Sequence, residues 1–289
     1  MTILDLYLVR HAESCGNILE SGSKTKNKNT TKNIYRKGKT AILQEPVLSI
    51  HGYIQSFYLK DYLEKSSIPY DKVICSPLIR TVITAMVALS TCNDEVNNNV
   101  IHILPYLKFH FTKLSRINSV NELKEKIHNF KIWFHTTGIH IYQLFREIHP
   151  SSPKNVVAIH FPRIDYTLLE KYERRFQVNA RVNIIDEFHE YIGKQSRTAI
   201  SSLLVFTHKR FITAMTSGQS LQTVPPTNTS ITKMTVNTLP NQPTFEIDSC
   251  KLVYIPSRVR SIKIKSEIEM CSRTTNAITR RRLRRRRIS

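Results

Sequence analysis

Two histidines and two arginines stand where short apolar segments of the sequence give way to polar ones. Arg10 and His11 follow the first of these segments, Arg80 lies shortly after a second, and His208 follows a third. A guanidinium binds phosphate oxygens through paired hydrogen bonds, and a neutral imidazole can attack phosphorus. The set therefore indicates phosphoryl-transfer chemistry, provided that the four side chains meet in one place.

The three apolar segments are typical of buried β-strands and cover residues 3–9, 73–75 and 202–206. After the second segment, Ser76 is a good N-cap and Pro77 a good first helical residue, so the sequence predicts a helix from there to about residue 90. Ligands of open α/β sheets bind at the carboxyl ends of the strands. The predicted strands would therefore place all four side chains at one edge of a sheet.

Strands and helices alternate through the first half of the chain and recur near residue 200. Further strands are predicted at 101–104, 156–159, 230–236 and 251–255, and further helices at 50–62, 168–176, 184–192 and 210–215. This alternation predicts an α/β fold, a three-layer sandwich with a mostly parallel sheet. We expect one domain over residues 1–258, with a basic loop at 21–40 and a variable helical or irregular insertion at 110–200, followed by a disordered, charged tail at 259–289.

The composition is that of a folded chain of 289 residues, 40% of them apolar. No apolar run approaches the roughly 18–20 residues of a membrane helix. Asp5 and Arg10 interrupt the first apolar stretch, which argues against a signal peptide. Five cysteines form no CxxC pair and no zinc spacing. We therefore expect an intracellular, cytoplasmic protein with free thiols, no disulfide, no metal and no cofactor.

The net charge is +21, and the arginines from Arg280 to Arg287 supply seven of these charges. A field of this sign attracts polyanions. The arginine run has no interleaved aromatic side chains, so it predicts non-specific, salt-sensitive binding of nucleic acid and leaves a nuclear location open. The lysine-rich stretch 21–40 predicts either a solvated insertion or a loop that recruits a phosphorylated substrate.

Five motifs occur in the order found in the histidine phosphatase superfamily, whose members have the phosphoglycerate mutase-like fold. They are Arg-His-Ala-Glu-Ser with Asn17 at 10–17, Glu-Pro-Val-Leu-Ser with Gly52 and Gln55 at 45–55, Ser-Pro-Leu-Ile-Arg with Thr84 and Ala85 at 76–85, the strand ending in Thr-His at 203–208, and Pro-Thr-Asn-Thr-Ser-Ile at 226–231. The resemblance implies that His11 is the phosphorylated nucleophile. It implies that Arg10, Arg80 and His208 complete the phosphate pocket. Ser14 and Asn17 would be supporting substrate contacts, the alternative being a capped turn.

The sequence departs from the family at the proton donor. Phe109 stands where the family usually has a glutamate, and Lys209 stands where another branch has an aspartate. Asp165, Glu170 and His110 are the substitutes that the sequence offers, and it does not choose among them.

The resemblance implies a metal-independent phosphomonoester hydrolase that acts on a phosphorylated small molecule or macromolecule. The missing acid leaves two alternatives. One is a weak or inactive phosphate-binding protein tethered to nucleic acid, and the other is a phosphotransferase of the phosphoglycerate mutase type.

Overall fold

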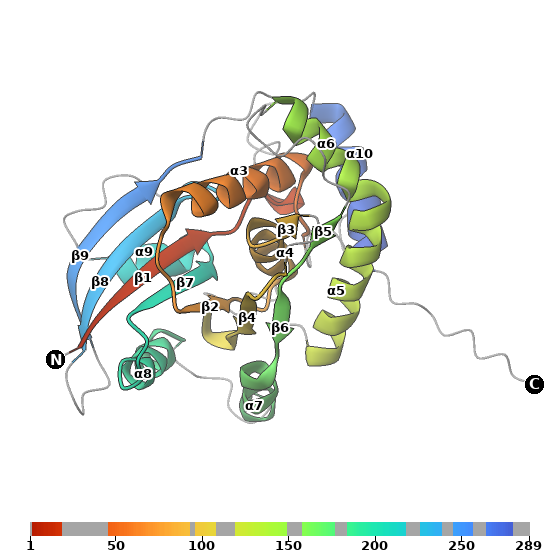
Figure 1. Ribbon diagram of the computed structural model, residues 1–289. Helices are drawn as coiled ribbons and strands as arrows, with labels where there is room; N and C mark the ends of the chain where they lie inside the picture. Colours follow the sequence, from red (N-terminus) through yellow and green to blue (C-terminus); the bar gives the residue numbers. More distant parts are fainter. Residues whose placement is uncertain are drawn as a thin grey trace, which may run out of the picture.

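A computed structural model describes residues 2–18, 46–92, 96–107, 119–148, 158–176, 184–217, 226–238, 245–256 and 264–279. Its centre is a seven-stranded sheet in the order β6-β4-β2-β7-β1-β8-β9 (Figure 1). The strands are β1 (Thr2–Arg10), β2 (Lys72–Cys75), β4 (Val100–Ile103), β6 (Arg163–Asp165), β7 (Ser202–Thr207), β8 (Ile231–Thr238) and β9 (Phe245–Tyr254). The first five are parallel, and β8 and β9 run antiparallel at one edge. The mostly parallel α/β sheet predicted from the sequence is confirmed.

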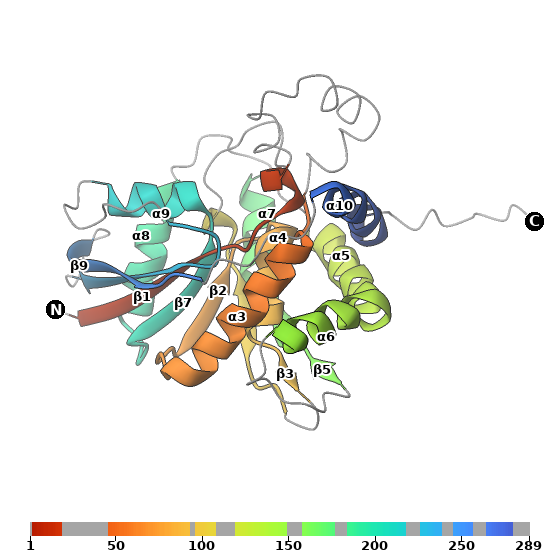
Figure 2. The same cartoon turned by 90° about the horizontal axis from the view of Figure 1, so that it is seen from above.

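Helices cover both faces of the sheet (Figure 2). One face carries α3 (Ile50–Ser66), α4 (Ile79–Ala88), α5 (Val120–Trp133), α6 (Ile139–Ile148) and α10 (Ile264–Thr279). The other carries α8 (Ile184–Gln195) and α9 (Lys209–Thr216), while α7 (Thr167–Phe176) contributes to both cores, with Leu169 in the first and Leu168 and Tyr172 against the second. β1 serves both cores because its side chains alternate: Tyr7 and Val9 face the first core, and Leu6 and Leu8 face the second.

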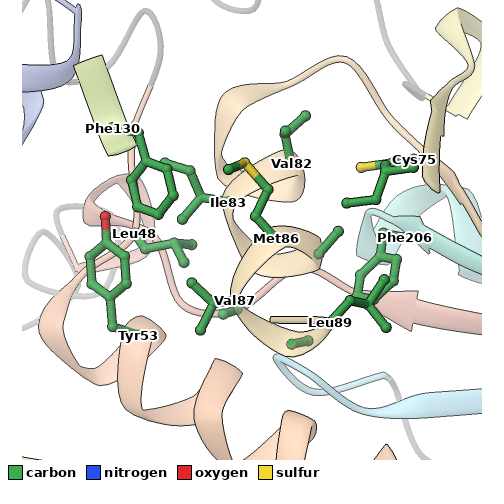
Figure 3. Close-up of a cluster of buried hydrophobic side chains, with 14 of the residues drawn as sticks. Leu48, Tyr53, Cys75, Val82, Ile83, Met86, Val87, Leu89, Phe130 and Phe206 are labelled. Atoms are coloured by element: carbon green, nitrogen blue, oxygen red, sulfur yellow. The ribbon is translucent and has the colours of Figure 1, made fainter. Parts of the chain in front are cut away.

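Helix α4 lies at the centre of the first core. Every residue of α4 except Arg80 is buried, and its side chains pack between Phe130 of α5 and Phe206 of β7 (Figure 3). A helix that is apolar all round can form only in such a place. The one exception, Arg80, lies in its first turn.

The start of α4 differs from the prediction. The helix begins at Ile79 with Leu78 as its N-cap, and no side chain caps it. Ser76 stands two residues before the N-cap. Its Oγ accepts from the amide of Leu78 at 3.5 Å and lies 2.8 Å from the Nε2 atom of His208, a residue 132 positions away.

The segment 110–200 contributes more regular structure than the sequence indicated. It holds α5, a π-helical turn η2 (Phe134–Gly138), α6, α7 and α8, and its strand β6 extends the main sheet. The predicted strand 156–159 shares only Ile159 with β5 (Ile159–His160). That strand pairs with β3 (Thr91–Cys92) in a small separate sheet. A 3₁₀ turn, η1 (Pro105–Leu107), follows β4.

The predicted disorder of the tail 259–289 is wrong for residues 264–279, which form α10. The buried side chains described in this helix are Cys271, Thr274, Thr275 and Ile278. Their spacing of three, four and seven is that of one helix face. The apolar periodicity of the sequence does not predict this face, because two of its four buried residues are threonines.

The arginine run and the basic loop 21–40 lie outside the described residues, and the division at residue 258 stays a prediction.

Within the described parts of the chain, no helix has the length and apolar character that a membrane crossing requires.

Candidate active site

The ends of two neighbouring parallel strands bring the two histidines together. β1 ends at Arg10 and β7 ends at Thr207, and these two residues are paired across the sheet. The backbone amide of His11 donates to the carbonyl oxygen of Thr207 at 2.9 Å. The His11 ring centroid consequently lies 5.1 Å from that of His208, with the rings tilted by 59°. The predicted meeting of the two imidazoles at one strand edge is present in the structure.

The surroundings of His11 fix which ring nitrogen is available for chemistry. Nδ1 lies 2.7 Å from the carbonyl oxygen of Ala12. Because a carbonyl oxygen only accepts, Nδ1 must carry the proton and Nε2 must carry the lone pair. Burial, followed by the positive charges of Arg80 and Arg10, holds the pKa of His11 well below its usual value. The imidazole is therefore neutral at physiological pH, as a nucleophile must be.

The two arginines approach the same imidazole from different elements. Arg10 is the last residue of β1, and its Nη1 donates to the carbonyl oxygen of Pro226 at 2.9 Å. Arg80 lies in the first turn of α4, where backbone N–H groups also favour an anion. Both side chains are partly buried, and both lie close enough to His11 to lower its pKa. Two guanidiniums beside a neutral imidazole form a site suited to a phosphoryl group.

His208 is held by hydroxyl groups. Its Nε2 lies 2.8 Å from Oγ of Ser76 and 3.4 Å from Oγ1 of Thr81. His208 is also the N-cap residue of α9. The sequence predicts Ser76 to be a helix cap and gives no signal for its contact with His208. Only the folded chain brings β7 and the segment after β2 side by side.

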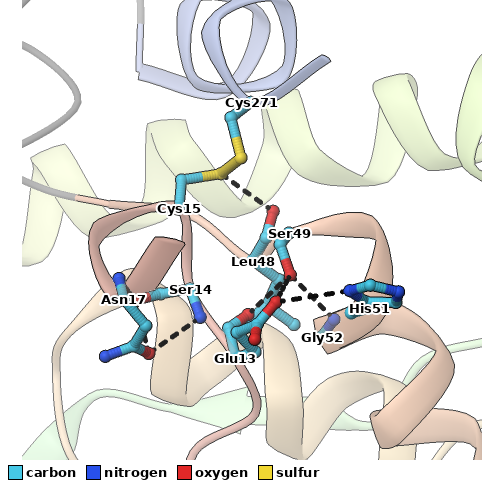
Figure 4. Close-up of a disulfide and its surroundings, with 9 residues drawn as sticks. All are labelled: Glu13, Ser14, Cys15, Asn17, Leu48, Ser49, His51, Gly52 and Cys271. Atoms are coloured by element: carbon cyan, nitrogen blue, oxygen red, sulfur yellow. Dashed lines mark hydrogen bonds and ion pairs between the residues drawn. A yellow bond between two sulfur atoms is a disulfide. The ribbon is translucent and has the colours of Figure 1, made fainter. Parts of the chain in front are cut away.

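The loop that follows His11 is held by the first turn of α3 (Figure 4). The backbone amide of Glu13 donates to Oε1 of Gln55 at 2.8 Å, and the amide of Ser49 donates to the carbonyl oxygen of Glu13 at 3.1 Å. The hydroxyl of Ser49 donates to the Glu13 carboxylate at 2.7 Å and accepts from the amide of Gly52 at 3.0 Å. The motif at 45–55 therefore positions the loop that follows His11.

Glu13 is a charged member of this loop and is not suited to act as an acid. Burial acts to raise the pKa of its carboxyl group, but contacts with His51 and Ser49 outweigh that effect and leave the pKa below the usual value. The Nδ1 atom of His51 lies 3.7 Å from the carboxylate. An ionised carboxylate accepts hydrogen bonds and has no proton to give, so Glu13 orients the loop.

Ser14 and Asn17 form the capped turn that the sequence left as an alternative. Oδ1 of Asn17 lies 3.0 Å from both the amide and the hydroxyl of Ser14. Ser14 is buried, whereas Asn17 is partly exposed. Their predicted contact with substrate stays a prediction.

The motif at 226–231 fixes the backbone of the nucleophile from the other side. Nδ2 of Asn228 donates to the carbonyl oxygen of His11 at 3.0 Å, and the amide of Thr229 donates to the carbonyl oxygen of Arg10 at 3.0 Å. Thr84 of α4 accepts from the amide of Ala12 at 3.1 Å. The sequence motifs contained Asn228 and Thr84, but nothing in their spacing assigned them these positioning contacts.

The described candidates for the proton donor are engaged elsewhere. Asp165 lies 2.7 Å from Nδ1 of His102 and accepts from the amide and hydroxyl of Thr167. Glu170 lies 3.3 Å from Nζ of Lys124. Asp165 lines an open groove of about 720 Å³ that includes none of the predicted pocket residues. Phe109 and His110 lie outside the described residues.

The cysteine prediction is wrong at one pair. Cys15 and Cys271 form a disulfide, with their Cα atoms 5.6 Å apart, and Cys75, Cys92 and Cys250 are free and buried. The two bonded residues are separated by 256 positions in the sequence. Spacing along a chain gives no measure of distance after folding, so no sequence motif predicts this disulfide.

No protein-family model matches the sequence, and no curated protein matches it. Several solved structures resemble its fold. A phosphoglycerate mutase from Bacillus anthracis str. Sterne is 15% identical, with a TM-score of 0.43, over 86% of this chain and 92% of that one. An alpha-ribazole phosphatase from Shigella flexneri is 15% identical, with a TM-score of 0.42, over 90% and 100%. A phosphoserine phosphatase from Entamoeba histolytica is 16% identical, with a TM-score of 0.39, over 86% and 96%.

At identities of 15–16% and TM-scores below 0.5, these likenesses assign neither a family nor a residue role to this chain. The residue roles proposed below depend on this chain's own motifs and contacts.

The low pKa of His11 is expected to appear directly in an NMR titration of its ring nitrogens. The signals should report an Nδ1-protonated, neutral ring at pH 6.5, where half of the ordinary imidazoles are charged. The unfolded chain takes up this proton near pH 6.5 and the folded chain does not. The stability linked to His11 is therefore complete above that pH and falls as the pH drops below it. The spectrum of His11→Gln assigns the signals, and a midpoint at or above 6.5 would contradict the buried site.

Proposed function

We propose that this chain is a phosphomonoester hydrolase of the histidine phosphatase superfamily that works without a metal through a phosphohistidine on His11. One observation carries the proposal. The His11 ring is held with Nδ1–H on a backbone carbonyl, and the ring lies beside His208 and within the fields of Arg10 and Arg80. This arrangement leaves Nε2 as a neutral nucleophile in a pocket for a dianion.

The reaction proceeds in two displacements. In the first, the Nε2 lone pair of His11 forms a bond to phosphorus and the ester P–O bond breaks, so the alcohol oxygen leaves with the electron pair. In the second, a water oxygen attacks phosphorus, the P–N bond breaks, and orthophosphate leaves. Arg10, Arg80 and a hydrogen bond from His208 stabilise the charge on the phosphoryl oxygens in both steps.

The missing acid sets the range of substrates. Within the described residues, Glu13 holds its charge, and Asp165 and Glu170 are bound elsewhere. General acid catalysis contributes about 10²–10⁴-fold, mainly where the leaving oxygen is strongly basic. Phosphate esters with good leaving groups are therefore the substrates that this site can hydrolyse without an acid.

The wild-type chain is expected to hydrolyse an aryl phosphate with no added metal and in the presence of a chelator. An alkyl phosphate should react more slowly by about 10²-fold or more, because its leaving oxygen needs a proton that none of the described carboxylates is placed to supply. The measurement is phosphate release from both esters at equal enzyme concentration. Turnover that needs a divalent cation would refute the metal-independent step, and equal rates on the two esters would reveal a proton donor.

A second function, in which the chain only binds phosphorylated ligands, is favoured by the same engaged carboxylates. It predicts no turnover of the aryl ester while orthophosphate still binds. Transfer of the phosphoryl group to a second substrate, as in a mutase, would instead require a pocket that excludes water. Nucleic-acid binding by the arginine run, and the cytoplasmic or nuclear location, stay predictions.

A further inference from the structure

The disulfide joins the loop of the nucleophile to the last helix of the fold (Figure 4). Cys15 follows His11 by four residues and begins a short helical turn at residues 15–18. Cys271 lies in α10, which packs against α5 and α3. Both cysteines are buried, with 0% and 5% of their surfaces exposed. The bond is therefore shielded from solvent while α10 is docked.

The side chains described in α10 are those of residue 271 and residues 273–279. Its buried face consists of Cys271, Thr274, Thr275 and Ile278, so Ile278 is the one large apolar side chain of this described face. Nδ2 of Asn129 in α5 donates to the carbonyl oxygen of Ile278 at 3.3 Å. Threonine side chains bury little apolar surface. The sulfur–sulfur bond adds a covalent link to these contacts between α10 and the rest of the fold.

The loop side of the bond is held independently of it. The amide of Cys15 donates to the carbonyl oxygen of Val47 at 2.9 Å, Ser14 is bridged to Leu48, and Asn17 accepts from Ser14. These contacts remain if the sulfur–sulfur bond opens. Opening it is consequently expected to release the helix and to leave the loop of His11 in position.

We propose that Cys15 and Cys271 form a reversible thiol modification site, which takes a small-molecule or protein dithiol as its reductant and anchors or releases α10. Disulfides in reducing compartments are usually transient or redox-sensing, which agrees with this role if the predicted location holds. The helix ends at Thr279, directly before the arginine run of the sequence. The redox state then decides whether residues 264–279 stay fixed beside α5.

The chemistry is ordinary thiol–disulfide exchange. A thiolate of the dithiol attacks one sulfur of the Cys15–Cys271 bond, that bond breaks, and the other cysteine leaves as a thiolate. The second thiol of the reductant then attacks the mixed disulfide and frees the first cysteine. Two electrons pass to the protein, two protons end on the two cysteine sulfurs, and the reductant leaves as its own disulfide.

The test uses the full chain before and after treatment with dithiothreitol. Alkylation under denaturing conditions, read by mass spectrometry, should label the three free cysteines in the oxidised protein and all five after reduction. Hydrogen exchange of residues 264–279 should accelerate at least about tenfold on reduction, while β7 should not change. Cys271→Ser should match the reduced wild type, and Cys250→Ser should match the oxidised one.

A second pair of variants tests whether reduction depends on opening of α10. Ile278→Ala weakens the docked face and should speed reduction at least about tenfold, because the reductant reaches the buried sulfurs only in the open state. Asn276 lies on the exposed face of α10, so Asn276→Ala should leave the rate of disulfide reduction unchanged.

Equal protection of α10 in both redox states would overturn the proposal. So would five reactive thiols in protein kept under mildly oxidising conditions. Neither readout uses phosphate hydrolysis, so the proposal and the phosphatase activity can fail separately.

Discussion

Replacing His11 with alanine is expected to reduce the turnover of an aryl phosphate by at least about 10³-fold, because removing the nucleophile of a covalent mechanism removes both of its steps. His11 is 6% exposed and packs beside His208, so the smaller side chain leaves the strand pairing of β1 and β7 intact. The measurement is the steady-state rate of phosphate release, with folding checked by thermal melting.

A matched histidine on the surface provides the control for this experiment. His140 of α6 is exposed and bonds only locally, through Gln143, so His140→Ala should keep wild-type turnover. Quenching the wild type during turnover in an alkaline denaturant, in which the P–N bond of a phosphohistidine survives, should also trap labelled phosphate on the protein, and His11→Ala should trap none. Residual turnover within tenfold of the wild type would remove His11 from the mechanism.

Replacing Gly52 with alanine is expected to lower activity by displacing the loop that follows His11. A Cβ atom at this position would lie 2.0 Å from the carbonyl oxygen of Glu13, which is a backbone atom and has nowhere to move except with the loop. Because Glu13 is two residues from the nucleophile, the displacement reaches His11. A misplacement of about 1 Å at a reacting group can cost about 10²-fold, and we expect a loss of kcat/KM of that order.

The stability of the same variant should fall even though alanine is the better helix former. In an ordinary helix interior the change from glycine to alanine gains about 1 kcal/mol. Here overpacking costs about 1–3 kcal/mol or more, so the clash outweighs the gain. Gly16→Ala is the control, since its Cβ would meet side-chain atoms and no backbone atom among its nearest neighbours: the ring of Pro46 at 3.1 Å and Oγ of Ser14 at 3.5 Å. A Gly52→Ala protein as active and as stable as the wild type would show that the loop is not held where the structure has it.

The sequence by itself determined the class of fold and the location of the site. The segments before His11 and His208 are short, apolar and rich in β-branched or aromatic residues, and such segments become buried strands in most surroundings. Once they are parallel neighbours, their carboxyl ends coincide, and the residues that follow them must meet. The prediction for α9 succeeded for the same reason, because a helix of clear periodicity beside a strand has few alternatives.

Predictions from local sequence preference failed where residues distant in the sequence contact the same group. Ser76 had the features of a helix cap, but its hydroxyl lies by His208 instead. The strand β6 was missed because Arg163, Ile164 and Asp165 show little apolar alternation, and only pairing with β4 makes them a strand. The helix α10 was not predicted because threonine residues do not produce the apolar periodicity that indicates a buried helix face. Each of these outcomes depends on a partner that sequence periodicity does not contain.

The location of the candidate site around His11 was thus predicted from residue types and their order along the chain, since a motif needs only local information. The tautomer of His11, its lowered pKa and the positioning by Ser49, Gly52 and Asn228 needed the tertiary structure. Hydrogen bonds, charges and burial act over ångströms in space, and separation along the sequence does not measure that distance. The Cys15–Cys271 bond is the clearest case, because its two sulfurs are 256 residues apart and covalently joined.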